Sequence, residues 1–309
     1  MTVFIQLVFF VVGFVMLVKG ADWFVDGTSG IAAKFGIPQL VIGLTIVAMG
    51  TSAPEAAVSI TAAMKGNADI TIGNIVGSNI LNILIILGIS AVITTIAVAR
   101  STIKYEIPMM IAITFFLLFV GMDGAVTFID GIILLAAFIV YLAYVFFMAR
   151  QKKEEEQGET KELTIMKAIF LTVVGLGLIV FGSDVTVDAA KEIARIFGLS
   201  ERFIGLTIVA LGTSLPELFT SVLAARKGNA DIAIGNIVGS NIFNILFVIG
   251  LSAFITPIPF AVAFRIDTLM AVAAAVILLL CSLKEKCLKR WNGVIMLGSY
   301  FIYFIYLCR

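Results

Sequence analysis

The sequence contains no histidine and few charged residues, with Asp, Glu, Lys and Arg making up only 13% of its 309 residues. The absence of histidine removes the commonest ligand of transition metals and the commonest proton shuttle. With a net charge of +1, the chain has no basic field that would recruit nucleic acid. Its three cysteines, Cys281, Cys287 and Cys308, form no disulfide or zinc pattern.

Long apolar runs take the place of the missing charge. Hydrophobic residues make up 61% of the chain and the mean hydropathy is +1.13, so it lacks the polar residues of a soluble surface. Because about 20 apolar residues cross a bilayer as a helix, the sequence predicts an all-α integral protein of the cell membrane with ten spans. The first run has no basic leader and no small-residue cleavage site, which indicates a retained helix. The expected spans are 3–20, 38–64, 69–95, 105–121, 126–149, 164–182, 200–225, 231–256, 264–282 and 290–307.

One polar segment of this apolar chain occurs twice. Residues 50–59 read GTSAPEAAVS and residues 212–221 read GTSLPELFTS, and each is followed by GNADI, IGNIVGSNI and NIL. Between 42–90 and 204–252, 35 of 49 positions are identical without a gap. A repeated acidic segment broken by proline, in a membrane protein, is typical of a cation transporter whose site lies between two repeats.

The hydrophilic segment RQKKEEEQGETKE (150–162) separates a first repeat (1–149) from a second (163–309). Each half contains five spans, an odd number, so the two repeats are predicted to have inverted topologies. With the linker in the cytoplasm, 14 Lys and Arg lie inside and six outside, Lys19 within the first span not being counted. The positive-inside rule therefore predicts that both termini lie outside.

The first and sixth spans each continue into a less apolar stretch. Asp22 and Asp26 in the first stretch correspond to Asp184 and Asp188 in the second. These four acids are expected to face water or the membrane interface.

Each repeat carries one glutamate near the middle of a span, Glu55 and Glu217. An ionisable group at that depth costs about 3 kcal/mol on insertion scales. Inverted repeats bring equivalent residues together near the midplane, where two like charges repel unless a cation lies between them. A protonated or hydrogen-bonded glutamate that only ties helices together is the alternative. The duplication favours a pair of cation ligands.

A proline precedes each glutamate and predicts a break in the helix. Pro54 and Pro216 each remove one amide donor and clash with the carbonyl four residues earlier. Such breaks are tolerated at membrane depth where the freed backbone lines a cavity, although a simple packing kink is the alternative. The carbonyls expected to turn toward an ion are those around Ala48, Gly50 and Thr51 and around Ala210, Gly212 and Thr213.

The second half of each motif supplies neutral oxygens. Residues four positions apart lie on one face of a helix, so these side chains are expected to point inward together. Interhelical hydrogen bonding is the alternative role, and the neighbouring glycines indicate close helix packing. The residues of this face are Asn74, Ser78 and Asn82 in the first repeat and Asn236, Ser240 and Asn244 in the second.

Carboxylates, hydroxyls, amide oxygens and carbonyls form an all-oxygen site, which suits hard cations such as Ca²⁺ and Na⁺. Two carboxylates balance the charge of one Ca²⁺, and several Na⁺ can use the same oxygens. Competition of two ions for one set of ligands is the physical basis of antiport. The expected partners are inorganic cations and the lipid bilayer, with no cofactor, no nucleic acid and no obligate protein partner.

The two copies of G-T-S-x-P-E and G-N-x-x-G-S-N resemble the alpha repeats of the calcium/cation antiporter superfamily, specifically its sodium/calcium exchanger branch. The resemblance covers nearly the whole chain. It implies a ten-helix inverted-repeat fold and a transporter rather than an enzyme. Such a transporter moves Ca²⁺ out against Na⁺ entry, by alternating access in which a two-helix bundle slides.

The resemblance also implies roles for individual residues. It places Ca²⁺ on Glu55 and Glu217 and on the carbonyls of Thr51 and Thr213. The fourth pair of positions in the family's site corresponds to Asn82 and Asn244. Some members carry an acid at one of these positions, and asparagine at both disfavours potassium dependence. The residues implied for Na⁺ and for lining the cavity are Ala48, Ser52, Ser78, Asn82, Ala210, Ser214, Ser240 and Asn244.

Three alternatives to Na⁺/Ca²⁺ exchange remain at this point. An H⁺/Ca²⁺ antiporter would resemble the branch with G-N-x-x-E in this region, which is absent here. An intramembrane hydrolase would use the two carboxylates to activate water, but the surrounding neutral oxygens include no obvious nucleophile. A passive cation channel would give flux without coupling to a counter-ion.

Overall fold

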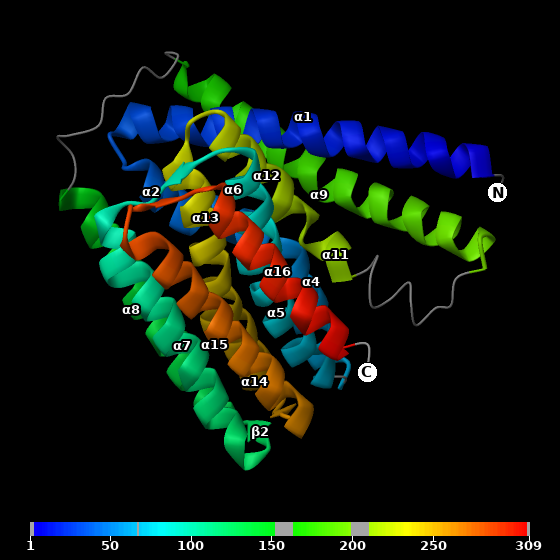
Figure 1. The fold of residues 1–309 in the computed structure, drawn as a ribbon, viewed down its shortest axis with the longest axis vertical. Coiled ribbons are helices and arrows are strands. Elements are labelled where there is room, and N and C mark those ends of the chain that lie inside the picture. Colours follow the sequence, from blue (N-terminus) through cyan, green and yellow to red (C-terminus); the bar gives the residue numbers. More distant parts are fainter. Residues whose placement is uncertain (1–2, 67, 152–162, 199–209, 308–309) are drawn as a thin grey trace.

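A computed structural model describes residues 3–66, 68–151, 163–198 and 210–307 (Figure 1). The expected linker 150–162 lies outside these residues from 152 onward, as does the start of the second motif up to 209. Helices dominate the described chain, because apolar segments without water must satisfy their backbone groups internally.

The first repeat runs from a long helix, α1, to α8. Its elements are α1 (Val3–Phe35), α2 (Gln39–Ile42), the π-helical turn η1 (Gly43–Val47), α3 (Ala48–Thr51), α4 (Ala53–Met64), α5 (Asp69–Leu81), the π-helical turn η2 (Asn82–Leu87), α6 (Gly88–Ile93), β1 (Ile96–Ala97), the π-helical turn η3 (Thr102–Glu106), α7 (Ile107–Val120), the 3₁₀ turn η4 (Gly121–Asp123), β2 (Ala125–Val126) and α8 (Phe128–Gln151).

The second repeat follows the same order. Its described elements are α9 (Ile165–Ile196), α11 (Ala210–Thr213), α12 (Leu215–Arg226), α13 (Ala230–Phe243), the π-helical turn η6 (Asn244–Ile249), α14 (Gly250–Ile255), β3 (Ile258–Pro259), α15 (Val262–Leu283), β4 (Cys287–Leu288) and α16 (Arg290–Leu307).

Each of the ten expected spans is mostly helical in the residues that the structure describes. Seven helices among the described residues are long and apolar enough to cross a membrane, or eight when the bent pair Gln39–Thr51 and Ala53–Met64 counts as one span. The remaining two are α11–α12, described only from Ala210, and the shorter α16. The first and sixth spans are longer than expected, because α1 and α9 continue unbroken through the less apolar stretches, over 33 and 32 residues.

Two composite helices form the centre of the molecule. The span Ile70–Ile93 is 78% buried and Ala230–Ile255 is 83% buried, whereas the other five long spans are 22–33% buried. The peripheral spans present large apolar side chains to the outside, as a lipid-facing surface requires. The most polar repeated motif, in α5–η2 and α13–η6, therefore lies where lipid does not reach.

Two short antiparallel sheets join the repeats. Ile96 of β1 pairs with Leu288 of β4, and Val126 of β2 pairs with Ile258 of β3. Ile258 is the repeat equivalent of Ile96, and Leu288 is the repeat equivalent of Val126. Each pair is separated by the 162 positions that also separate Asn79 from Asn241. The two sheets are thus equivalent under the internal two-fold symmetry of the fold.

Helices α1 and α9 form a separate antiparallel pair. They lie side by side and run across the molecule, whereas α7, α15 and α16 run steeply down it (Figure 1). Their close approach depends on glycine: a Cβ added at Gly20 would lie 2.8 Å from the Gly175 carbonyl oxygen. The pair contacts the rest of the protein mainly through α12, with smaller contacts to α2, α3 and α11.

Replacing Gly175 by leucine is expected to separate α1 from α9 and to destabilise the protein by about 1–3 kcal/mol, the usual cost of overpacking. A Cβ at Gly175 would lie 2.6 Å from the backbone nitrogen of Phe24, which has no flexible end that can move away. The matched control is Gly177→Leu on the same helix, where an added Cβ meets nothing within 4 Å. Thermal unfolding in detergent is the measurement, and equal midpoints for the two variants would contradict this packing.

Candidate ion-binding site

Two helix breaks lie at equivalent places in the repeats. Ser52 (φ −82°, ψ 7°) separates α3 from α4, and Ser214 (φ −91°, ψ 4°) separates α11 from α12. Each break is followed by proline in the first turn of the next helix, Pro54 in α4 and Pro216 in α12. The axis bends by 51° across the first break. The predicted proline breaks are therefore present, because proline cannot donate to the carbonyl four residues earlier.

The breaks place the two glutamates at new helix N-termini. Glu55 lies in the first turn of α4 and Glu217 in the first turn of α12, and both are fully buried. A carboxylate is favoured there, since the first amides of a helix carry partial positive charge. No basic side chain in the described part of the chain forms an ion pair with either glutamate. A buried carboxylate pair without a basic partner calls for a cation or protons.

Serine hydroxyls connect the glutamates across the repeats. Ser52 Oγ donates to Glu217 Oε1 at 2.7 Å, from the first repeat to the second. Ser78 Oγ lies 3.4 Å from Glu55 Oε1, to which it donates, and 3.3 Å from Ser214 Oγ of the second repeat. The site thus belongs to both repeats at once.

Four asparagines form a reciprocal seam between α5–η2 and α13–η6. Asn79 Nδ2 donates to the Asn241 carbonyl at 3.2 Å, and Asn241 Nδ2 donates to the Asn79 carbonyl at 3.1 Å. The side-chain oxygen of each of these residues also accepts one amide, from Asn82 to Asn241 at 3.1 Å and from Asn244 to Asn79 at 3.0 Å. The seam fixes the side-chain Nδ2 atoms of Asn82 and Asn244, so that their Oδ1 atoms point away from Asn241 and Asn79.

Four buried oxygens in this region accept no hydrogen bond from any residue that the structure describes. They are two carboxylate oxygens and two amide oxygens, one of each from each repeat, and buried acceptors of this kind ordinarily have a partner. A cation satisfies such acceptors. The four atoms are Glu55 Oε2, Glu217 Oε2, Asn82 Oδ1 and Asn244 Oδ1.

Thr51 and Ser240 lie in the same buried region. Thr51 Oγ1 donates to Asn236 Oδ1 at 3.0 Å, and Ser240 Oγ donates to the Ala48 carbonyl at 3.3 Å. Thr213 is half-buried, in contrast to the buried Thr51. Ala210 is described only by its backbone, at the start of α11.

Two residues expected to face the site make contacts with neighbouring helices. The Gly212 carbonyl accepts a hydrogen bond from Ser183 Oγ of α9 at 2.8 Å, which occupies one of its two lone pairs. Asn74, expected on the inward face, donates through Nδ2 to Ser59 Oγ at 2.9 Å and to the Glu55 carbonyl at 3.3 Å. Both contacts hold helices together, which is the packing role that the sequence left open.

The sequence reasoning missed Asn79 and Asn241. Both belong to the repeated GSNI motif, so their identity across the repeats was a signal that they act in both halves. One position after Ser78, Asn79 lies on another helical face, and only the packing of α5 on α13 brings the two asparagines together.

The donor set of this region consists of oxygen alone. No group of three or more His, Cys, Asp or Glu side chains gathers anywhere in the described residues. A site on Glu55 and Glu217 therefore depends on neutral oxygens for the rest of its coordination. Such a set fits hard cations that take hydroxyl, amide and carbonyl ligands.

Comparison with known proteins gives a consistent assignment. The family model for the sodium/calcium exchanger protein matches residues 5–147 and 167–309. The chain is 43% identical over 296 residues to the putative antiporter CaxA of Alkalimonas amylolytica, covering 93% of this chain and 92% of CaxA. It is 33% identical to the sodium/calcium exchanger MaX1 of Methanosarcina acetivorans, covering 96% of both chains.

Solved structures show the same architecture. The structure of the sodium-calcium exchanger NCX_Mj soaked with 10 mM Na⁺ and zero Ca²⁺ superimposes with a TM-score of 0.87 at 34% identity, covering 98% of this chain and 99% of that chain. The expected fold of ten helices in two inverted repeats is confirmed. The chain belongs to the sodium/calcium exchanger protein family.

Proposed function

We propose that this protein exchanges Na⁺ for Ca²⁺ across the membrane by alternating access, as an antiporter and not an enzyme. The family relationship supports this activity. The single observation that carries it is a set of four buried oxygens, on Glu55, Glu217, Asn82 and Asn244, that have no hydrogen-bond partner in the described part of the chain. Two carboxylates and two amides, arranged symmetrically between the repeats, suit cation coordination at the centre of an inverted-repeat transporter.

In this proposal Ca²⁺ binds between the carboxylates of Glu55 and Glu217, with the carbonyls of Thr51 and Thr213 as further ligands. The two negative charges balance the divalent ion, and the remaining oxygens satisfy its preference for six to eight ligands. Na⁺ then competes for overlapping oxygens, so that occupancy by one ion excludes the other. The residues proposed for Na⁺ and for the cavity lining are Ala48, Ser52, Ser78, Asn82, Ala210, Ser214, Ser240 and Asn244.

We further propose that both termini lie outside the cell and the linker 150–162 in the cytoplasm. The excess of Lys and Arg that this orientation places inside supports it. Na⁺ entry down its gradient drives Ca²⁺ extrusion, and the exchange is electrogenic when more than two Na⁺ move for each Ca²⁺.

Flux into proteoliposomes tests the proposal. Vesicles loaded with Na⁺ and diluted into Na⁺-free buffer should accumulate ⁴⁵Ca²⁺, and collapsing the Na⁺ gradient should stop uptake. Uptake that follows a pH gradient instead would assign H⁺/Ca²⁺ exchange. Uptake independent of both gradients would indicate a passive channel and would refute antiport.

A further inference from the structure

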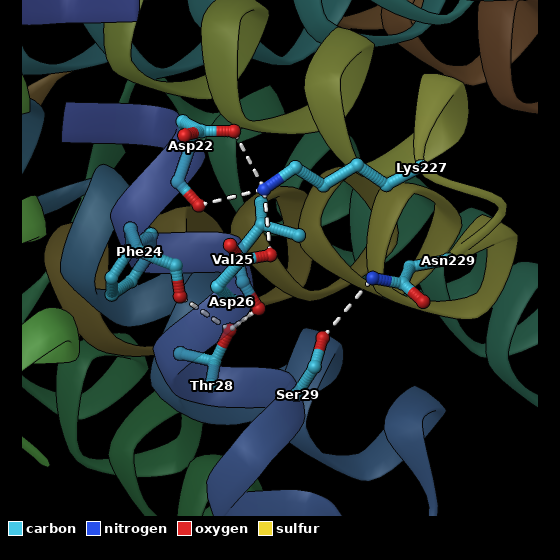
Figure 2. Close-up of polar contacts among 8 residues, drawn as sticks. All are labelled: Asp22, Phe24, Val25, Asp26, Thr28, Ser29, Lys227 and Asn229. Carbon is cyan, nitrogen blue, oxygen red and sulfur yellow. Dashed lines mark hydrogen bonds and ion pairs between the residues drawn. The ribbon is translucent and has the colours of Figure 1, made fainter. Parts of the chain in front are cut away.

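Lys227, in the turn after α12, binds two acids of α1 (Figure 2). Its Nζ lies 2.7 Å from Asp22 Oδ1 and 2.6 Å from Asp26 Oδ1, and it also donates to the Asp22 carbonyl at 2.9 Å. We call Asp22, Asp26 and Lys227 the α1 clasp. It ties the second half of α1 to the end of α12, the helix that carries Glu217.

A second contact reinforces the α1 clasp. Asn229 Nδ2 donates to Ser29 Oγ at 3.1 Å, one turn further along α1 (Figure 2). The lysine side chain is only 23% exposed, whereas the two aspartates are 38% and 48% exposed. An ammonium group that contacts three oxygens and is partly shielded from water stabilises this contact more than a single exposed ion pair would, which contributes about 0–1 kcal/mol.

The repeat contains the same three residues a second time. At the offset of 162 positions that separates Asn79 from Asn241, Lys65 corresponds to Lys227, and Asp184 and Asp188 correspond to Asp22 and Asp26. We call Asp184, Asp188 and Lys65 the α9 clasp. Its charges are present but not joined: Lys65 is exposed and, in the described part of the chain, forms no ion pair with either aspartate.

The aspartate that should join the α9 clasp has another partner. Asp188 Oδ1 lies 3.0 Å from Nζ of Lys191, a lysine one turn away on the same helix, and remains 74% exposed. The position equivalent to Lys191 in α1 is Ser29, which binds Asn229 instead. One clasp is therefore closed and the other is open, although the sequence supplies both.

The packing of α1 on α9 links the two clasps mechanically. Added Cβ atoms at Gly13 and Gly27 would lie within 3 Å of Gly182 and Thr172 respectively, so the two backbones touch along an antiparallel register. The two helices therefore move as one body. Because they are antiparallel, the aspartates of α1 and those of α9 lie toward opposite ends of that body.

We propose that the two clasps are alternative: the α1 clasp closes in the state described here, and the α9 clasp closes in the state that opens to the opposite side of the membrane. This inference rests on the proposed alternating access, in which inverted repeats exchange conformations. Lys227 and Lys65 are then positioning residues that set the balance between the two states. A contact shifts such an equilibrium only by the difference between its free energies in the two states. Because each lysine closes its clasp in a different state, the two lysines shift the equilibrium in opposite directions.

The test measures the conformational balance directly. Nitroxides on exposed positions of α1 and α15, Val8 and Val262, report the distance between the helix pair and the bundle in a variant whose cysteines are replaced. Lys227→Gln is expected to reduce the population described here by about three- to tenfold relative to the other. Lys65→Gln is expected to increase it by a similar factor.

Two further variants keep the result interpretable. Lys34→Gln removes an exposed lysine from α1 without touching either clasp and should leave the populations unchanged. Lys227→Asp combined with Asp26→Lys restores an opposite-charge pair and should recover the parental balance. Shifts of the same sense for Lys227→Gln and Lys65→Gln, or no shift in either, would overturn the alternation of the clasps.

The distance readout separates this inference from the ion assignment. A parental protein with a single distance population under Na⁺ and under Ca²⁺ would contradict the clasps. Two distance populations that the Lys227 and Lys65 variants shift in opposite directions would support the clasps. Flux that proved independent of the Na⁺ gradient would contradict the proposed ions and would leave this support for the clasps intact.

Discussion

Glu55→Gln and Glu217→Gln are each expected to abolish Ca²⁺ transport. Both carboxylates are fully buried and each keeps one oxygen that accepts no hydrogen bond from the described residues, so that oxygen is available to a bound cation. Removing one partner from a buried charge pair costs about 3–5 kcal/mol. That loss lowers Ca²⁺ affinity by about two to four orders of magnitude.

Na⁺-driven ⁴⁵Ca²⁺ uptake into proteoliposomes measures this effect. Glutamine fills the same volume and can still accept the hydrogen bond that Ser52 donates to Glu217, so the variants should fold and unfold at temperatures no lower than the parent. Glu192→Gln is the matched control, because that glutamate is half-exposed on α9 and pairs with Arg195. Transport retained in both buried variants would show that the ion lies elsewhere.

The sequence predicted those parts of the site that depend on local chemistry. Proline four residues after Gly50 and Gly212 requires a helix break, and the structure shows breaks at Ser52 and Ser214. A glutamate that directly follows the proline must lie in the first turn of the next helix. Duplication without a gap then implied that both repeats contribute to a single site.

Other features depend on how helices meet and could not be read from one sequence. The π-helical turns η2 and η6 begin at Asn82 and Asn244, but the sequence NIL fits an α-turn and a π-turn equally well. The open and closed clasps consist of the same three charged residues, so which clasp is joined depends on their three-dimensional arrangement and on Lys191, which replaces Ser29 beside the α9 clasp. The Ser183 bond to the Gly212 carbonyl likewise follows from the position of α9.

Asn79→Leu is expected to weaken Na⁺-driven transport about tenfold although Asn79 itself holds no free oxygen. Leucine removes the donor to the Asn241 carbonyl and the acceptor of the Asn244 amide, at distances of 3.2 and 3.0 Å. Each buried group left without a partner costs about 1–3 kcal/mol. The Asn244 amide then turns to find another acceptor, and its Oδ1 leaves the position in which the seam held it.

The symmetry of the seam makes this prediction specific. Asn241→Leu should have an equal effect through Asn82, and the double variant should lose less than the sum of the two, because residues of one hydrogen-bond network are not independent. Ile80→Ala is the control: Ile80 is fully buried beside Asn79, so the variant loses packing, about 2–5 kcal/mol, without touching an amide. The half-saturating Na⁺ concentration distinguishes the two causes, since it should rise for the leucine variants and stay constant for Ile80→Ala. Leucine variants that lose stability as Ile80→Ala does, with no change in half-saturating Na⁺, would reduce the asparagine seam to a packing contact.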